Sequence, residues 1–335
     1  MLNGSRLARV AGAPRWVIIV SFAVLLSLSG ALGLVRATKA RLDEVARVPG
    51  MGAVLSPATA GVENVLIVGS DSRAGADPDD PDYANVGSES DTPGMRSDSM
   101  IVARIDGATG RVALMSIPRD LWVRIGDSEK YNRINAAYQE GPATLVRTVQ
   151  RALNIPVHHY VEIGFPGFRR IVDSIGGVRI CVQRPSRDLS TGYFSGRGCK
   201  RLNGAKALAY ARGRHFEEKR NGRWVEEGTG DVGRGARQRA FMAALVKDAA
   251  AHLVAHPMDT ERVLSAFAAA VTVDERIDLV DLARKLRPLG NGGGDSYSLP
   301  VVSDMLDGKF VFHLDNDAQA LLAHFSGLAP APAAG

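Results

Sequence analysis

Two apolar runs joined by a glycine-bearing loop constrain the fold of this chain more than any other feature. The runs are Ser99 to Ile105 and Arg111 to Ile117, and the loop between them contains Gly107 and Gly110. Glycine supplies the positive backbone angles that hairpin loops require, so the segment predicts two antiparallel strands. This pairing places the residue before the first strand and the residues after the second at one open end. Asp98 and Arg119 occupy these positions.

A shorter apolar run, Asn64 to Gly69, predicts a buried strand, and Asp71 follows it closely. If this strand lies beside the hairpin, Asp71 reaches the same end of the sheet as Asp98 and Arg119. Further along the chain, helical and strand patterns alternate, which indicates an α/β domain. Helices are predicted near 141–153, 168–175, 202–211, 237–252, 259–271, 279–286 and 316–325, and strands near 159–163, 178–182, 297–302 and 310–314.

Arginines are concentrated between Tyr210 and Arg239. Guanidinium groups keep their charge and match phosphate oxygens two at a time, so the cluster suggests a phosphate or pyrophosphate ligand. A basic surface helix paired with the glutamates of the same stretch explains the pattern equally well. The stretch contains Arg212, Arg214, Arg234 and Arg237 with Asp231 and Gln238 among them, and the glutamates Glu217, Glu218, Glu226 and Glu227.

Composition and motifs exclude several classes of protein. The chain has 335 residues, 45% of them hydrophobic, which is enough for a substantial core. Its net charge of +5 is small for this length, and no basic helix interleaved with aromatic residues occurs, so we expect no nucleic-acid partner. The motifs of serine hydrolases, nucleoside-triphosphatases and dinucleotide-binding folds are also absent from the sequence.

The segment from Trp16 to Val35 contains no charged residue and has the length of a membrane-spanning helix. We interpret it as a membrane anchor. A cleaved signal peptide is the alternative, because Gly30, Ala31 and Gly33 provide small residues for a cleavage site. Basic residues flank both ends of the span, so the charge distribution leaves its orientation open. The predicted organisation is a short cytoplasmic segment at 1–15, the anchor at 16–35, a linker at 36–61, one domain at 62–327 and a disordered tail at 328–335.

Cys181 and Cys199 are the only cysteines. In a chain with an export-type N-terminus they predict one disulfide, which stabilises the fold by roughly 3 kcal/mol for a loop of this size. Two reduced thiols in a cytosolic domain are the alternative. An oxidised pair would place the bulk of the chain outside the membrane.

Asp71 and Asp98 are oxygen donors of the kind that Mg²⁺ or Mn²⁺ binds together with substrate phosphates and water. Arg119 and the arginines at 212, 214 and 234 would then neutralise the rest of a diphosphate. The alternative is that each aspartate at a strand end is an ordinary turn residue.

Seven motifs in a fixed order make the chain resemble the LytR-CpsA-Psr family of membrane-anchored cell-wall ligases, and in particular its actinobacterial members. The resemblance covers Asn64 to Ala250. It implies a single extracytoplasmic α/β domain, with a central mixed β-sheet flanked by helices, after one transmembrane helix in the cell membrane. The motifs are NVLIVGSDSR, RSDSMIVARID, VALMSIPRDLWVRI, NRINAAYQEG, IVDSIGGVRI, LNGAKALAYARGRH and DVGRGARQR.

Members of this family transfer glycopolymers from a polyprenyl-diphosphate carrier to the 6-hydroxyl of muramic acid in peptidoglycan. The actinobacterial character makes arabinogalactan the expected glycopolymer, with capsular polysaccharide or teichoic acid as the alternatives. A polyprenyl-diphosphate pyrophosphatase and a non-catalytic transcriptional attenuator or lipid-binding regulator are the alternatives.

The resemblance also implies roles for single residues. Asp71 and Asp98 would hold the metal ion, and Asp98, Arg119 and Asp231 would act in catalysis, with Asp231 orienting an arginine or accepting a proton. Arg133 stands where the family commonly has lysine. The diphosphate would be bound by Arg119, Arg133, Arg212, Arg214, Arg234 and Gln238. The long polar segment from Phe216 to Gly230 departs from the family pattern and predicts either a mobile rim of the cleft or a disordered insertion.

Overall fold

The structure is a computed structural model that describes residues 40–57, 61–71 and 97–332. The chain separates into two units, Met1–Asp43 and Glu44–Gly335, and the second unit carries the sheet and the candidate site. The predicted cytoplasmic segment and the anchor from Trp16 to Val35 lie outside the described residues. Among the helices that are described, none combines the length and the apolar character that a membrane crossing requires.

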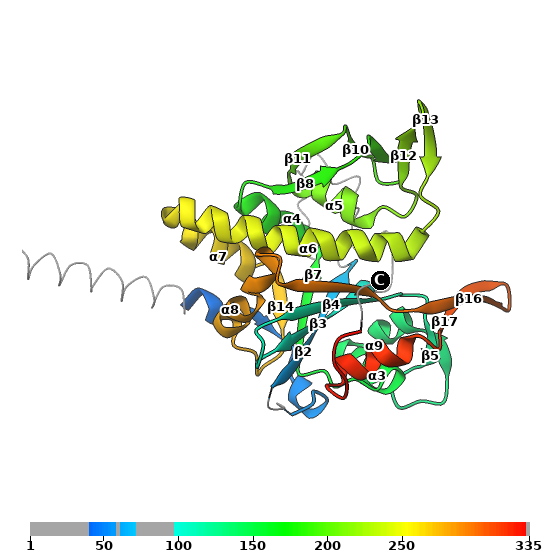
Figure 1. The fold of residues 1–335 in the computed structure, drawn as a ribbon. Coiled ribbons are helices and arrows are strands. Elements are labelled where there is room, and N and C mark those ends of the chain that lie inside the picture. Colours follow the sequence, from blue (N-terminus) through cyan, green and yellow to red (C-terminus); the bar gives the residue numbers. More distant parts are fainter. Residues whose placement is uncertain (1–39, 58–60, 72–96, 333–335) are drawn as a thin grey trace, which may run out of the picture. The chain divides into compact units, whose positions relative to one another are not determined.

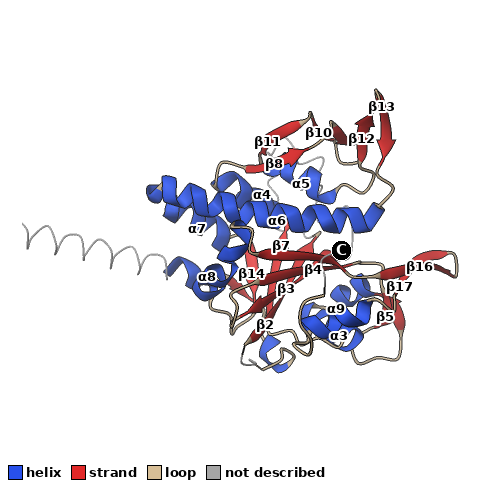
Figure 2. Ribbon diagram, viewed as in Figure 1, coloured by secondary structure: helices blue, strands red, loops and turns tan. Residues whose placement is uncertain are grey.

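A mixed seven-stranded sheet forms the centre of the second unit (Figures 1 and 2). Neighbours β2–β3 and β3–β4 are antiparallel, whereas β2–β7 and β4–β15 are parallel. The predicted hairpin, the strand beside it and the α/β class with a mixed sheet are therefore confirmed. In spatial order the strands are β1 (Ala46–Arg47), β14 (Val271–Val273), β7 (His159–Gly164), β2 (Val62–Ser70), β3 (Ser97–Asp106), β4 (Val112–Ile117) and β15 (Gly294–Ser298).

One face of the sheet packs against α3 (Pro142–Leu153) and α9 (Ala318–Phe325). Because side chains alternate along a strand, Leu66, Met100 and Met115 point to this face and are fully buried with the two helices. The outcome is a core of aliphatic and aromatic side chains that holds β2, β3 and β4 in fixed register.

The opposite face is covered by α4 (Phe165–Ser174), α6 (Gly230–Ala255) and α8 (Leu279–Gly290), with α5 (Gly204–Arg212) and α7 (Thr260–Ala268) against α4. Sequence periodicity predicted that α6 begins at Arg237, but it begins at Gly230. Two glycines weaken the helical pattern there. Gly235 lets the helix lie directly on β4, since a Cβ at this position would be 2.7 Å from the Ser116 hydroxyl oxygen.

A smaller sheet lies on the far side of α6 from the central sheet (Figure 2). A second core supports it, formed by side chains of α4, α5 and α6 with Tyr193 and Phe216. The segment from Phe216 to Gly230 is therefore not a disordered insertion: it forms a hairpin of this sheet and the first turn of α6. The strands, in order, are β10 (Tyr193–Ser195), β9 (Ser186–Asp188), β12 (Glu217–Arg220) and β13 (Arg223–Glu226).

The predicted disulfide is confirmed. Cys181 and Cys199 are directly opposite each other in the antiparallel pair β8 (Val178–Val182) and β11 (Gly198–Leu202), and their sulfurs are 2.01 Å apart. The bond therefore links β8 covalently to β11 within the segment between α4 and α5.

Two boundaries differ from the predicted ones. The linker was expected to reach residue 61, but β1 pairs with β14 and both Met51 and Leu55 are buried in the main core. Two apolar residues four positions apart are too few to establish a helical period, so the sequence pattern missed them. The single strand expected at 297–302 is two strands, because Pro300 interrupts it and lacks the N–H that a ladder needs. Of the predicted tail, 333–335 lie outside the described residues.

The remaining elements are short. They are η1 (Met51–Ala53), β5 (Trp122–Arg124), β6 (Tyr131–Arg133), η3 (Ile134–Glu140), η4 (Pro257–Asp259), β16 (Val301–Leu306) and β17 (Lys309–Leu314).

Candidate functional site

The predicted acidic pair lies where β2 ends and β3 begins. Ser70 pairs with Ser97 across these two strands, so the backbones of Asp71 and Asp98 are neighbours at one edge of the sheet. The side chain of Asp98 is outside the described part of the structure. The Ser97 hydroxyl beside it is buried and finds no hydrogen-bond partner among the described residues. A buried hydroxyl of this kind is usually satisfied by a water or a ligand.

Three of the predicted arginines form an arginine network with two aspartates, defined as Arg119, Asp120, Arg133, Asp231 and Arg234. The Asp231 carboxylate is 2.5 Å from Arg234 and 3.9 Å from the Arg119 Nε, and Asp120 is 3.6 Å from Arg119 and 3.3 Å from Arg133. Each carboxylate bridges two guanidinium groups and holds them side by side. The geometry fits the first of the two roles predicted for Asp231, orienting arginines.

Exposure within the arginine network increases from one end to the other. The Arg234 side chain is 5% exposed, that of Arg119 17% and that of Arg133 34%. Arg133 also donates a 2.7 Å hydrogen bond to the Phe310 carbonyl, which fixes it against β17. Sequence reasoning missed Asp120, although it directly follows Arg119 in its motif.

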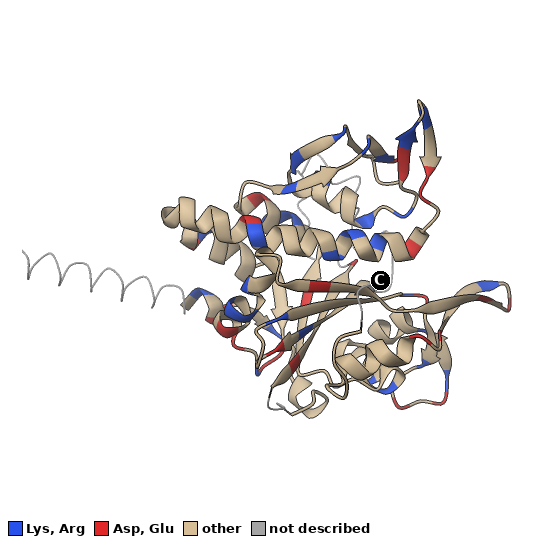
Figure 3. Ribbon diagram, viewed as in Figure 1, with Lys and Arg blue, Asp and Glu red and all other residues tan. Residues whose placement is uncertain are grey.

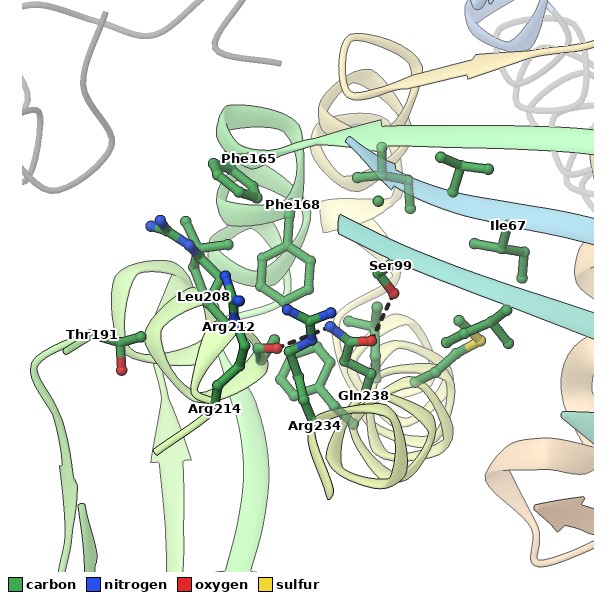
Figure 4. A pocket seen from close by; sticks show the side chains of 18 of the residues that line it. Ile67, Ser99, Phe165, Phe168, Thr191, Leu208, Arg212, Arg214, Arg234 and Gln238 are labelled. Atoms are coloured by element: carbon green, nitrogen blue, oxygen red, sulfur yellow. Dashed lines mark hydrogen bonds between the residues drawn. The ribbon is translucent and has the colours of Figure 1, made fainter. Parts of the chain in front are cut away.

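A pocket of about 350 Å³ opens beside this network. Figure 4 shows the arginines gathered at one end of it, with Ile67 of β2 at the other end. At the polar end are Arg212, Arg214, Arg234 and Gln238. The walls are otherwise mostly apolar and come from the sheet and from α4, α5 and α6; they include Ile67, Ile101, Phe165, Phe168, Leu208, Phe241, Met242 and Leu245.

Gln238 joins three elements at the polar end of the pocket. Its Nε2 donates to the Ala211 carbonyl at 3.0 Å, and its Oε1 accepts from the Ser99 hydroxyl at 2.7 Å (Figure 4). These bonds connect α6 to the C-terminal turn of α5 and to β3. Arg212 ends α5, and its guanidinium carbon lies 4.6 Å from the centre of the Phe165 ring. Gln238 therefore holds the arginine-bearing end of α5 against the sheet.

Arg237 is a structural residue, although the sequence placed it among the clustered arginines. It donates to the Gly213 carbonyl at 2.6 Å, pairs with Glu227 and lies over the Phe216 ring. Its side chain is 9% exposed. Because Gly213 lies between Arg212 and Arg214, this bond fixes the turn that presents them.

The glutamates of the stretch are paired away from the pocket. Glu217 binds Arg187, Glu218 binds both Arg184 and Arg220, and Glu226 contacts His215. The two interpretations of the arginine-rich stretch thus apply to different parts of it: the hairpin is salt-bridged at the surface, and the flanking arginines face the pocket.

Asp188 is a buried carboxylate that sequence reasoning missed. It accepts hydrogen bonds from the Ser190 amide and hydroxyl, the Thr191 amide and the His215 amide. Burial raises the pKa of Asp188, but the hydrogen bonds from Ser190, His215 and Thr191 outweigh it and leave the pKa below its usual value. Asp188 thereby ties the Ser190–Thr191 wall of the pocket to the residue after Arg214. No local motif marks it.

A second missed cluster lies near Asp71 on the α3 face of the sheet. The Tyr138 and Tyr160 hydroxyls both donate to Glu162 of β7, Tyr160 at 2.8 Å. Burial raises the pKa of Tyr138, the charge of Glu162 raises it further, and the charge of Asp71 adds to the shift. The charge of Asp71 therefore acts on the buried Tyr138 hydroxyl.

Comparison with known proteins agrees with this geometry. A family model described as the LytR_cpsA_psr family matches residues 35–323. The chain belongs to the LytR_cpsA_psr family. A relative, the probable cell wall biosynthesis protein LcpB of Corynebacterium glutamicum, is 34% identical over 247 residues, which are 73% of this chain and 56% of the relative. The polyisoprenyl-teichoic acid–peptidoglycan teichoic acid transferase TagV of Bacillus subtilis is 35% identical over 173 residues, 49% of this chain and 40% of that protein.

This member of the LytR_cpsA_psr family spans about half the length of the curated relatives it matches. Its fold also matches a solved structure, the LytR-Csp2A-Psr enzyme from Actinomyces oris, with a TM-score of 0.64 and 27% identity. That match covers 84% of this chain and 96% of the other. The family resemblance inferred from the seven motifs is therefore confirmed.

Proposed function

We propose that this chain transfers a glycopolymer from a polyprenyl-diphosphate carrier to the 6-hydroxyl of muramic acid in peptidoglycan. The observation that carries the proposal is an apolar pocket of about 350 Å³ with arginines at one end. This arrangement suits a hydrocarbon chain that ends in phosphates. The TagV relative is named as a polyisoprenyl-teichoic acid–peptidoglycan teichoic acid transferase, and this name supports the same class of reaction.

In this proposal Arg212, Arg214 and Arg234 bind the diphosphate oxygens, while the walls from α4, α5 and α6 enclose the start of the prenyl chain. Asp231 holds Arg234 and Arg119 so that both keep their orientation as charge develops. The acceptor hydroxyl releases its proton to solvent and its oxygen forms a bond to the sugar-linked phosphorus. The bond from this phosphorus to the bridging oxygen breaks, and polyprenyl phosphate leaves with that oxygen. Such a reaction depends on positioning and charge neutralisation.

The donor set at the sheet edge fits Mg²⁺ or Mn²⁺. The backbones of Asp71 and Asp98 lie close together where β2 ends and β3 begins, and carboxylate oxygens are the donors that these ions prefer. When bound, the ion would neutralise charge on the diphosphate. We propose that the two aspartates hold it, while the arginines bind the remaining phosphate oxygens.

Arabinogalactan is the glycopolymer we propose, and the outer side of the cell membrane is the proposed location. Relatives from Corynebacterium and Actinomyces support arabinogalactan as the glycopolymer. The Cys181–Cys199 disulfide supports a location outside the membrane. The polymer is tested by profiling the sugars that mild acid releases from the cell wall of a strain lacking this chain. Arabinose and galactose at wild-type levels would exclude arabinogalactan as a substrate for which this chain is required.

The transfer itself is tested with a labelled polyprenyl-diphosphate sugar and purified peptidoglycan, with and without Mg²⁺. We expect labelled peptidoglycan only with the metal, and a loss of at least about 100-fold in Asp98→Ala. Asp127→Ala is the matched control, because this carboxylate is 80% exposed on the surface. Labelled peptidoglycan formed without metal, or formed equally by Asp98→Ala, would show that Asp98 does not hold a metal ion that the reaction needs.

Two other outcomes of the same assay identify the alternatives. Release of polyprenyl phosphate at the same rate with and without peptidoglycan would indicate a pyrophosphatase. Saturable binding of the lipid without any turnover would indicate a lipid-binding regulator.

A further inference from the structure

The smaller sheet carries two aromatic side chains on the face that points away from its core. Along β10, Tyr193 and Ser195 are buried, so Phe194 between them points outward and is 64% exposed. Trp224 of β13 lies on the same face, because its ring centre is 6.3 Å from that of Phe194. Phe194 is exposed and Trp224 is half-buried, and an apolar surface of this kind next to polar groups can mark a binding site.

Charged side chains surround these two rings in fixed positions. The Arg187 guanidinium carbon lies 4.3 Å from the centre of the Trp224 ring, and its Nε donates to Glu217 at 2.5 Å. The Lys219 amine is 6.0 Å from the same ring. We call this surface the outer face and define it by Phe194, Arg187, Glu217, Lys219 and Trp224. The Arg187 guanidinium and the Glu217 carboxylate lie beside the rings, and their hydrogen bond already holds both groups in place.

The sheet that carries the outer face is tied to the arginine-bearing part of the chain at two places. The loop between β9 and β10 supplies Ser190 and Thr191 to the pocket lining, and Asp188 at the end of β9 accepts from the amide after Arg214. After β13 the chain reaches Glu227, which pairs with Arg237 of α6. The smaller sheet is therefore held in a fixed position relative to the elements that present the pocket arginines.

We infer that the outer face binds the glycan strand of peptidoglycan, the acceptor in the proposed reaction, on which this inference rests. Sugar rings present C–H faces that pack on aromatic rings, while their hydroxyls and amides bond to paired guanidinium and carboxylate groups. The carboxylates of the peptide stems provide negative charge. Figure 3 shows basic residues on β8, β11 and β12 together with acidic residues on β12 and β13, and between residues 178 and 227 the sequence has twelve Lys and Arg against five Asp and Glu. The positive balance of this segment favours the acidic glycan over a neutral polymer such as arabinogalactan.

Cosedimentation with peptidoglycan sacculi, stripped of covalently attached polymers, tests the inference directly. The full-length chain is compared with Phe194→Ala, Trp224→Ala and the double variant. We expect the double variant to bind sacculi at least about 10-fold more weakly than the wild type. Trp224→Phe should bind more strongly than Trp224→Ala. Binding of geranylgeranyl diphosphate should be the same in all of these variants. Met258→Ala removes an apolar side chain that is 93% exposed elsewhere and serves as the control.

The outcomes separate this inference from the proposed function. Equal sedimentation of the wild type and the double variant, or no sedimentation of the wild type, would overturn the inference. An increase in the KM for the lipid-linked donor with an unchanged KM for peptidoglycan would also overturn it, because the face would then bind the donor glycan. If the sedimentation pattern holds but the wild type transfers no sugar, the proposed function fails and the glycan-binding face stands. Thermal unfolding of each variant reports whether its fold is intact.

Discussion

Two buried charge networks lie at opposite ends of the same strand, β2. The arginine network lies near its C-terminal end, beyond Asp71. A histidine network, defined as Glu63, His159, Asp274 and Lys285, lies at its start. His159 Nε2 is 2.9 Å from Glu63, its Nδ1 is 3.1 Å from Asp274, and Lys285 is 2.5 Å from Glu63.

The networks differ in their balance of charge. In the histidine network the carboxylates match the cations. Burial lowers the pKa of His159, but its hydrogen bonds to Asp274 and Glu63 raise it to about 9. In the arginine network three guanidinium groups share two aspartates in the described contacts, and Arg234 reaches the pocket. Removing one partner of an enclosed ion-pair network destabilises the fold, whereas guanidinium groups that line a pocket suit an anionic ligand.

The largest effect that would separate the two networks is expected for Arg234→Ala. We expect transfer to fall about 1000-fold, because a charge-assisted contact to the diphosphate is lost in a water-poor site. Initial rates of labelled-sugar transfer measure this. Arg284→Ala, which removes a surface guanidinium that is 66% exposed, is the matched control. Full activity in Arg234→Ala would show that the arginine network is structural, like the histidine network.

The converse change is Asp274→Ala in the histidine network. The Asp274 carboxylate is inaccessible to solvent and accepts from His159 and from the Tyr160 and Arg276 amides. Its loss leaves the Nδ1 of His159 and two amides without an acceptor, while His159 keeps its contact to Glu63, so we expect the free energy of unfolding to drop by about 3 kcal/mol. Urea denaturation measures the drop. The transfer rate of the folded fraction should stay at the wild-type level, and a selective loss of rate would contradict a purely structural role.

The histidine network also predicts a pH dependence. The folded pKa of His159 is about 9 against an ordinary 6.5, so its contribution is complete below pH 6.5 and is lost as pH rises through 9. The pKa of Glu63 is lowered from 4.5 to about 2, so its contribution is complete above pH 4.5 and is lost as pH falls toward 2. We expect a loss of about 3 kcal/mol between pH 6.5 and pH 9.5. Denaturation of the wild type and His159→Gln across this range is the measurement, and parallel curves would refute the assignment.

The smallest effect is expected for Gly235→Ala, which changes no charge. The added Cβ would lie 2.7 Å from the Ser116 hydroxyl and 3.1 Å from its Cβ, so α6 must move away from β4. We expect a destabilisation of about 1–2 kcal/mol, with a weaker diphosphate site because Arg234 and Gln238 move with the helix. The control is Gly196→Ala, where nothing lies within 4 Å of the added Cβ. Equal stability of the two variants would show that the close approach is not needed.

Local sequence signals predicted the backbone conformation well where it depends on residues only a few positions apart. The loop from Asp106 to Gly110 specified the β3–β4 hairpin, and the helical period before Arg212 placed that arginine at the end of α5. The same signals failed at the start of α6. There Gly233 and Gly235 disfavour a helix by propensity, and packing on β4 reverses that preference.

The candidate site was predicted only in part for the same reason. Motifs indicated the arginines, but they did not show that Arg237 turns inward to Gly213, nor that Asp188 holds the loop after Arg214. The contact between His159 and Asp274 joins residues 115 positions apart. No local pattern specifies such a pair.

The sequence by itself determined the family, the α/β class, the hairpin that places Asp98 and Arg119 at one end, and the disulfide. Only the tertiary structure decided which arginines face the pocket and which are held by carboxylates. The physical reason is range: backbone propensity and side-chain periodicity act between near neighbours, whereas ion pairing depends on which distant segments packing brings within about 4 Å of each other.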